Sequence, residues 1–174
     1  MNVLLGVTGS VAAVLTPKLV EALTSQGNIV TVVMTKHAPK FLKENVKHYN
    51  DDDEWGVFDE IGDPILHIEL RKWADVLLVA PCTMNTLGKI ANGLCDNLLT
   101  NIVRAWDGSK RFFIAPAANT HMWSHPITQQ QLIVLQEELG VNVIMPVEKT
   151  LACGDTGVGA MADIKTIVER ITCK

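Results

Sequence analysis

Short, mostly unbroken runs of apolar residues recur along the chain, and longer segments with helical spacing separate them. The runs lie at Val3–Val7, Ile29–Met34, Val76–Ala80, Phe112–Ala115 and Val141–Met145. Each has the length of a β-strand, and as a group they are rich in branched side chains. Strands that are buried on both faces of a parallel sheet have this pattern, because helices cover both sides of such sheets.

Helical patterns fill the intervals between these runs. In Ser10–Gln26 apolar residues recur at every fourth position, and Pro17 predicts a kink there, because proline removes one backbone hydrogen bond. Alternatively, Thr16 and Pro17 cap a shorter helix. Further helices are expected at Lys36–Glu44, Leu66–Trp73, Thr83–Ala91, Asp96–Trp106, Thr128–Leu139 and Asp163–Thr172. The alternation predicts an α/β fold, a doubly wound parallel sheet of the Rossmann-like, flavodoxin type with helices on both faces.

Length, composition and charge narrow the function classes. The 174 residues suit a single domain, and the 48% of hydrophobic residues is enough for a substantial core. The formal net charge of −4 comes without a basic stripe, so we expect no nucleic-acid partner. No apolar run reaches the roughly 20 residues of a membrane-spanning helix, and the N-terminus lacks the basic region of a signal peptide. The four cysteines form no C-x-x-C pair. We therefore expect a cytoplasmic protein with reduced thiols, no metal and no membrane contact.

Two segments depart from the alternation of strands and helices. Asn50–Asp63 is rich in Asp and Glu, which predicts a solvated loop, because a metal site would need ligands that converge. Pro146–Ala162 is rich in glycine and has no clear helix or strand pattern. A structureless segment of this length inside a compact domain is usually functional, so we expect a mobile flap at about residues 146–162.

Small and hydroxyl-bearing residues follow the predicted strands at their carboxyl ends. They stand at Thr8–Ser10, Thr35–His37, Pro81–Thr86 and Pro116–Trp123. Ligands of open α/β sheets bind outside the carboxyl ends of the strands, so these segments form one candidate site. Gly9 and Ser10 offer backbone N–H groups and a hydroxyl either to a phosphate or to the start of a helix. Together with Thr83, Asn85 and Thr86 they suggest a mononucleotide such as FMN.

Three side chains have an ordinary structural interpretation beside a functional one. His67 lies between apolar neighbours, as packing histidines do, and Asn119 stands in a loop where asparagine commonly forms turns. Cys153 is flanked by Ala152 and Gly154, so it is the thiol that a ligand reaches most easily. The residues alone do not choose between these interpretations.

Several sequence strings, taken together, resemble one family. Pro116–Trp123 reads PAANTHMW and matches the motif P-x-M-N-x-x-M-W, except that Ala118 stands where the motif has methionine. Ala152–Met161 matches the family's substrate-clamp flap, and Lys72 replaces the arginine usual in close relatives. Further matching strings are Thr8–Ala12, Gly62–Leu70, Trp73–Asp75, Asn85–Ala91, Gly93–Thr100 and Arg104–Asp107. Over essentially its whole length the chain resembles the homo-oligomeric flavin-containing cysteine decarboxylase family.

The resemblance implies a reaction and its residues. The expected reaction is FMN-dependent decarboxylation of 4′-phosphopantothenoylcysteine to 4′-phosphopantetheine, a step of coenzyme A biosynthesis. The substrate thiol would be oxidised to a thioaldehyde, CO₂ would leave, and the enethiol would be reduced. His67 is then the base during thiol oxidation, and Cys153 donates a proton during reduction. Asn119, Ala152 and Met122 are implied to bind the substrate.

The resemblance also implies the cofactor residues and an assembly. The residues implied to line FMN are Gly9, Ser10, Val11, Thr35, Lys36, Thr83, Met84, Asn85, Thr86 and Ala117. A homotrimer with FMN at the subunit interface is expected. The alternatives are a regulatory flavin-binding subunit of a protein phosphatase and a peptidyl-cysteine decarboxylase. The joint presence of His67, Asn119 and Cys153 favours an enzyme over the regulatory subunit.

Overall fold

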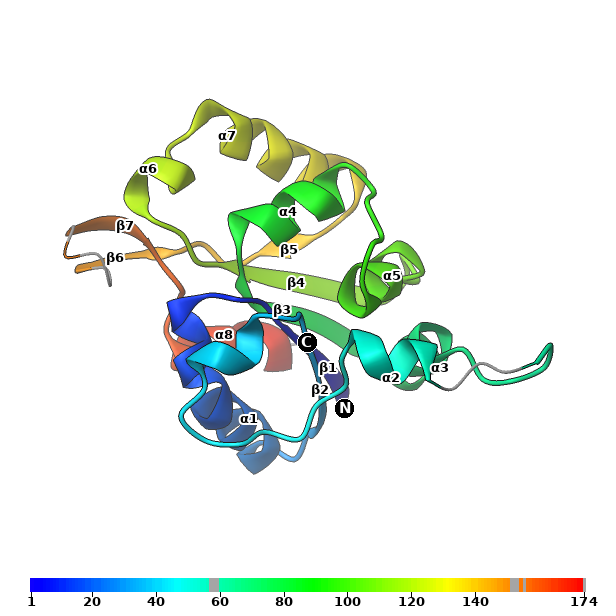
Figure 1. Ribbon diagram of the computed structural model, residues 1–174. Helices are drawn as coiled ribbons and strands as arrows, with labels where there is room; N and C mark the ends of the chain where they lie inside the picture. The colour runs from blue at the N-terminus through cyan, green and yellow to red at the C-terminus, as the bar shows by residue number, and fades with distance from the viewer. Residues whose placement is uncertain (57–59, 151–153, 155, 174) are drawn as a thin grey trace.

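A five-stranded parallel sheet forms the centre of the molecule (Figure 1). The computed structural model describes residues 1–56, 60–150, 154 and 156–173. The sheet has the order β2-β1-β3-β4-β5, and all of its pairings are parallel. Its strands are β1 (Asn2–Val7), β2 (Ile29–Met34), β3 (Val76–Cys82), β4 (Arg111–Pro116) and β5 (Asn142–Val143). This is the flavodoxin-like strand order, and it confirms the predicted fold class.

Helices cover both faces of the sheet, and each face has its own apolar core. On one face, α1 (Thr16–Ser25) and α8 (Ile164–Thr172) pack on the sheet, and their buried residues join one cluster. The other face is covered by α3 (Leu66–Trp73), α4 (Met84–Ala91), α5 (Leu98–Arg104) and α7 (Pro126–Ile133). Neighbouring strand residues alternate between the two cores, so Leu77 joins one cluster and Leu78 the other. Among the described residues, none of the helices has the length and apolar character that a membrane crossing requires.

The first helical segment begins differently from the predicted kinked helix. A 3₁₀ turn, η1 (Val11–Leu15), precedes α1, and Pro17 lies in the first turn of α1. The kink at Pro17 was therefore the wrong prediction. The alternative of a shorter helix is confirmed, although its N-cap is Leu15 and Thr16 is its first residue. Proline is tolerated there because the first N–H groups of a helix have no partner within the helix.

Two further expectations about helices need correction. The helix expected at Lys36–Glu44 is only a 3₁₀ turn, η2 (Ala38–Phe41), in which Ala38 alone is fully buried, so little packing is available to extend it. The solvated loop expected at Asn50–Asp63 is wrong for its first part, where α2 (Asp51–Trp55) forms. Asn50 caps α2 by accepting hydrogen bonds from the N–H groups of its first turn. The acidic residues of that turn stabilise the helix because they lie at the positive end of its dipole.

The glycine-rich segment before α8 contains an antiparallel hairpin. Strand β6 (Val147–Thr150) pairs with β7 (Thr156–Ala160), which corrects the expectation of a segment without secondary structure. The hairpin reaches the end of β4, because the N–H of Ala118 donates to the carbonyl of Gly159 at 2.9 Å. A Cβ atom on Gly159 would overlap the carbonyl oxygen of Ala118, so only glycine permits this approach.

Candidate active site

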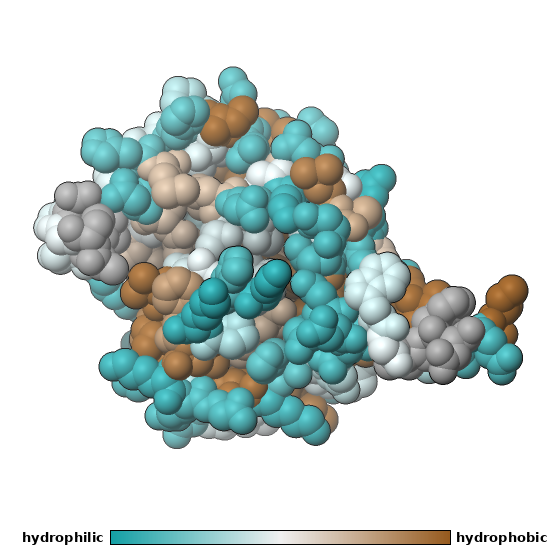
Figure 2. Space-filling view, in the orientation of Figure 1, coloured by the Kyte–Doolittle hydropathy of each residue, from teal (hydrophilic) through white to brown (hydrophobic). Residues whose placement is uncertain are grey.

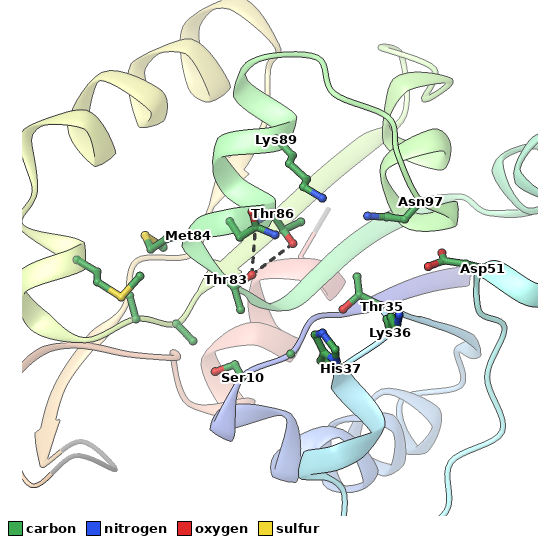
Figure 3. Close-up of a pocket in the computed structure, with 15 residues that line it drawn as sticks. Ser10, Thr35, Lys36, His37, Asp51, Thr83, Met84, Thr86, Lys89 and Asn97 are labelled. Carbon is green, nitrogen blue, oxygen red and sulfur yellow. Dashed lines mark hydrogen bonds between the residues drawn. The ribbon is translucent and has the colours of Figure 1, made fainter.

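A cavity of about 570 Å³ opens where β1, β2, β3 and β4 end (Figure 3). This volume is in the range of small-molecule sites, and the position is the one expected for ligands of open α/β sheets. The cavity is lined by Gly9, Ser10, Thr35, Lys36, His37, Asp51, Thr83, Met84, Asn85, Thr86, Lys89, Asn97, Ala117, Ala118 and Met122. The structure thus brings together every residue predicted to line FMN except Val11.

The N-terminus of α4 forms one wall of the cavity. Thr83 is its N-cap, and its Oγ1 accepts from the N–H of Thr86 at 3.4 Å and donates to Oγ1 of Thr86 at 3.3 Å. Behind it, the buried hydroxyl of Thr8 donates to the carbonyl of Pro81 at 2.7 Å and accepts from the N–H of Thr83 at 2.9 Å. These bonds tie the ends of β1 and β3 together. The wall offers hydroxyls and the positive end of a helix dipole, which suit an anionic group.

A close approach of two loops forms the opposite wall. A Cβ atom on Gly9 would stand 3.0 Å from Cβ of His37, so the loops after β1 and β2 meet where glycine leaves the backbone accessible. Ser10 caps η1, since its Oγ accepts from the N–H of Ala12 at 3.3 Å. Its hydroxyl hydrogen is still available to a ligand, so the capping and ligand-binding interpretations of Ser10 are compatible.

Polar residues that sequence reasoning missed complete the rim of the cavity. Lys89 donates to both carboxylate oxygens of Asp96, at 2.6 and 2.9 Å, and this hydrogen bond lowers the pKa of Asp96. Asp51 and Asn97 come from α2 and from the cap of α5. Lys89 could have been found from its three-residue spacing after Thr86, which places both on one face of a helix. No local signal identified Asp51, because it reaches the cavity only through the fold.

A second cavity, of about 440 Å³, adjoins the first and shares Ser10, Ala117 and Ala118 with it. It is lined further by Val11, Ala12, Val14, Leu15, Asn119, Lys149, Thr150, Gly159, Ala160 and Met161. Val11 therefore lies beside the first cavity rather than in it. Asn119 is the N-cap of α6 (Thr120–Trp123), and its Oδ1 accepts from the N–H of His121 at 2.9 Å. The two cavities together extend from the sheet to the β6–β7 hairpin.

The predicted reactive residues are distributed over three places. Met122 lines the first cavity and Asn119 the second. His67 lines neither cavity; it lies on α3, where its Nδ1 contacts Oε1 of Glu54. Ala152 and Cys153 lie outside the described residues. Within one chain, the structure therefore does not bring His67 to the residues predicted to hold FMN.

The buried cysteine at the end of β3 has no reactive character. Burial raises the pKa of the Cys82 thiol to about 12, because desolvation disfavours the thiolate. Cys95 and Cys173 are exposed. Among the described residues, no group of three or more His, Cys, Asp or Glu side chains is arranged to hold a metal ion.

Comparison with known proteins decides the family. The sequence profile of the family described as "Flavoprotein" matches residues 1–174. The chain belongs to the flavoprotein family. This flavoprotein is 51% identical over 175 residues to a phosphopantothenoylcysteine decarboxylase of Arabidopsis thaliana, covering 98% of this chain and 83% of the relative. The match confirms the resemblance found from the motifs.

Solved structures resemble this flavoprotein over nearly its whole length. A PPC decarboxylase mutant complexed with pantothenoylaminoethenethiol superposes with a TM-score of 0.92 and 50% identity, covering 98% of this chain and 95% of that one. The FMN-binding protein AtHal3 superposes with a TM-score of 0.88 and 50% identity, covering 98% and 94%.

Proposed function

We propose that this flavoprotein is an FMN-dependent phosphopantothenoylcysteine decarboxylase. It converts 4′-phosphopantothenoylcysteine to 4′-phosphopantetheine and CO₂ in coenzyme A biosynthesis. The observation that carries this proposal is the near-complete structural match, at half identity, to a PPC decarboxylase with a pantothenoyl thiol bound. We place the enzyme in the cytoplasm, where its thiols stay reduced.

The residues of the first cavity fit FMN. The hydroxyls of Thr83 and Thr86 and the N-terminus of α4 suit the phosphate, and the backbone of Gly9 is open to close approach. The remaining residues proposed to hold FMN are Ser10, Val11, Thr35, Lys36, Met84, Asn85 and Ala117. When bound, FMN supplies a two-electron oxidation and the later reduction of the substrate's cysteinyl group.

The protein contributes binding, proton transfer and exclusion of water. Asn119, in the second cavity, binds the substrate carboxylate. Met122, in the first cavity, and Ala152 are the other residues proposed to bind the substrate. His67 takes the thiol proton, and the electron pair on sulfur forms the C=S bond of a thioaldehyde as the adjacent carbon loses a hydride, which bound FMN would accept. Loss of CO₂ then moves the electrons of the carbon–carbon bond toward sulfur and gives an enethiolate. Cys153 donates a proton when this species is reduced.

The segment at about residues 146–162 acts as the substrate flap. Lys149, Thr150 and Gly159 of the hairpin already line the second cavity. Movement of this flap over the bound substrate excludes water and brings Cys153 to the place where the proton is needed. Because oxidation and loss of CO₂ precede that step, a Cys153→Ser protein should decarboxylate the substrate and then stall. Mass spectrometry should detect the oxidised enethiol product; phosphopantetheine formed at the wild-type rate would remove Cys153 from this role.

The active site is shared between copies of the chain in a homotrimer. His67 lies outside both cavities of its own chain and keeps a side chain that is 25% exposed, which supports its use by FMN held in a neighbour. Trp55, Ile61 and Ile65 of the α2–α3 segment (residues 51–73) are exposed apolar side chains. Figure 2 shows brown atoms at the right, where this segment projects. An apolar, exposed projection of this kind is typical of a protein–protein interface.

A direct assay tests the proposed function. The purified protein with FMN is incubated with 4′-phosphopantothenoylcysteine, and CO₂ and 4′-phosphopantetheine are measured. We expect CO₂ and 4′-phosphopantetheine to be released in equal amounts. His67→Asn should abolish turnover while FMN, followed by its absorbance, stays bound to the protein. A protein that holds FMN and gives no turnover would instead support a regulatory flavin-binding subunit.

A further inference from the structure

Glu54 is the buried acid of α2, a helix that also carries exposed acidic residues. Its side chain is 6% exposed, whereas Asp52 and Asp53 of α2 are exposed. Buried carboxylates are rare unless they are paired. Both oxygens of Glu54 are used: Oε1 contacts Nδ1 of His67, and Oε2 accepts from Nδ2 of Asn101 at 3.1 Å. The burial of Glu54 therefore serves contacts with two other helices, α3 and α5.

The contact with Glu54 decides which nitrogen of His67 carries the proton. A carboxylate accepts hydrogen bonds and donates none, so Nδ1 of His67 must be the donor. In the neutral imidazole, Nε2 then holds the free lone pair. Nε2 has no hydrogen-bond partner among the described residues, and the side chain of His67 is partly open to solvent. The arrangement presents a histidine base on the side that a ligand can reach.

The support behind Glu54 is rigid. Asn101 lies on α5, whose residues Leu98, Leu99 and Ile102 are fully or almost fully buried in the core. One turn before Glu54, Asp51 of α2 accepts from the N–H of Leu98 at 2.9 Å. Two residues on one face of α2 therefore attach it to α5. A base whose orienting group is itself held in place loses little entropy when the substrate arrives.

We propose that Glu54 is the positioning residue of His67. It keeps the proton on Nδ1, so that the lone pair of Nε2 takes the proton of the substrate thiol; this assignment rests on the proposed function. In that step the S–H bond breaks, an N–H bond forms at Nε2, and the electron pair stays on sulfur. The carboxylate of Glu54 offsets the positive charge of the imidazolium that results. Glu54 acts through His67 and does not itself contact the substrate.

Steady-state kinetics of the FMN-loaded protein give the first test. Glu54→Leu removes the acceptor and should lower kcat about 10²-fold, within the usual contribution of acid–base catalysis. Glu54→Gln keeps an acceptor without the charge and should lower kcat about tenfold, with KM within about threefold of wild type in both variants. The matched control is Asp52→Asn, the same change of acid to amide at an exposed position of α2, and it should leave kcat unchanged.

The protonated nitrogen can be measured without turnover. In the holoprotein labelled with ¹⁵N-histidine, the His67 resonances are assigned by their loss in His67→Asn. Wild type and Asp52→Asn should show the proton on Nδ1 of neutral His67. Glu54→Leu should show a mixture of the two tautomers, because no other described residue fixes the proton.

FMN affinity separates positioning from a structural effect. Because Asp51 of α2 lines the first cavity, a displaced α2 should weaken FMN binding. If Glu54 acts only through His67, Glu54→Gln should therefore bind FMN as tightly as wild type. Wild-type kcat in both Glu54 variants, or a fall in the kcat of Glu54→Leu with the tautomer unchanged, would overturn the proposal. If Glu54→Leu does not fold, the kcat and the FMN affinity of Glu54→Gln decide. A wild-type protein without turnover would refute the proposed function, whereas the tautomer measurement would still test the Glu54–His67 contact.

Discussion

At the scale of single residues, Ala118 is the position where this chain departs from the motif of its family. It lies where the two cavities meet, so a longer side chain there has space on two sides. We expect Ala118→Met to fold and to change turnover by no more than about threefold, because volume is available and the core need not be repacked. Ala115→Met is the matched control: Ala115 is fully buried in β4, and overpacking there should cost about 1–3 kcal/mol. Urea denaturation and the product assay measure both variants, and a large gain in turnover for Ala118→Met would mean that Ala118 weakens this catalyst.

The thiols also differ residue by residue. Burial raises the pKa of the Cys82 thiol to about 12. At pH 8 this pKa is about four units above the pH, so only about 10⁻⁴ of the Cys82 side chains are thiolates. Since alkylation requires the thiolate, iodoacetamide at pH 8 should modify the exposed Cys95 and Cys173 and leave Cys82 intact in the native protein. In urea all three should react. Rapid native labelling of Cys82, seen by peptide mass spectrometry, would contradict its burial.

At the scale of elements, the end of β1 is attached to the start of α4 by one hydroxyl. Thr8 uses its Oγ1 both as a donor to Pro81 and as an acceptor from Thr83, in a fully buried position. Thr8→Val keeps the size of the side chain but removes its hydrogen bonds to the carbonyl of Pro81 and the N–H of Thr83. We expect the free energy of unfolding to fall by about 1–3 kcal/mol. It should also weaken FMN binding, because Thr83 caps the helix that forms a cavity wall. Thr24→Val, on the exposed side of α1, is the control and should change FMN affinity little. Equal FMN affinity in Thr8→Val and Thr24→Val would show that the hydrogen bonds of Thr8 do not shape the cavity.

The elements also show what the sequence could and could not predict. Continuous apolar runs located the strands of the sheet, because strands buried on both faces leave little room for polar residues. The segments that follow the strands predicted the first cavity, because the carboxyl ends of parallel strands meet at one edge of the sheet. Short helices such as α2 were missed because their stability comes from a cap and from distant partners rather than from apolar periodicity. Glu54 illustrates this limit, since its partners, His67 and Asn101, are 13 and 47 positions away in the sequence.

At the scale of the whole molecule, the projecting α2–α3 segment is the feature that a lone chain explains least well. Trp55 is 77% exposed and Ile61 fully exposed, beside the half-exposed Ile65. Large apolar side chains gathered on one projection are costly in water and are typical of surfaces that another protein covers. The same segment carries His67, which lies on α3 and lines neither cavity. Covering this segment with a second copy would explain both observations.

Assembly can therefore be tested on this segment together with activity. Light scattering of the wild-type protein should give a mass of three times 19.0 kDa with FMN bound. Trp55→Asp places a charge on the projection and should shift the protein to monomer, with loss of turnover, because the proposed site needs His67 from one copy and the cavity of another. Ile29→Asp is the control: Ile29 is 64% exposed at the start of β2 and is not part of the α2–α3 segment, so the variant should stay trimeric and active. A wild-type protein that is monomeric, holds FMN and turns over substrate would show that one chain completes the site alone.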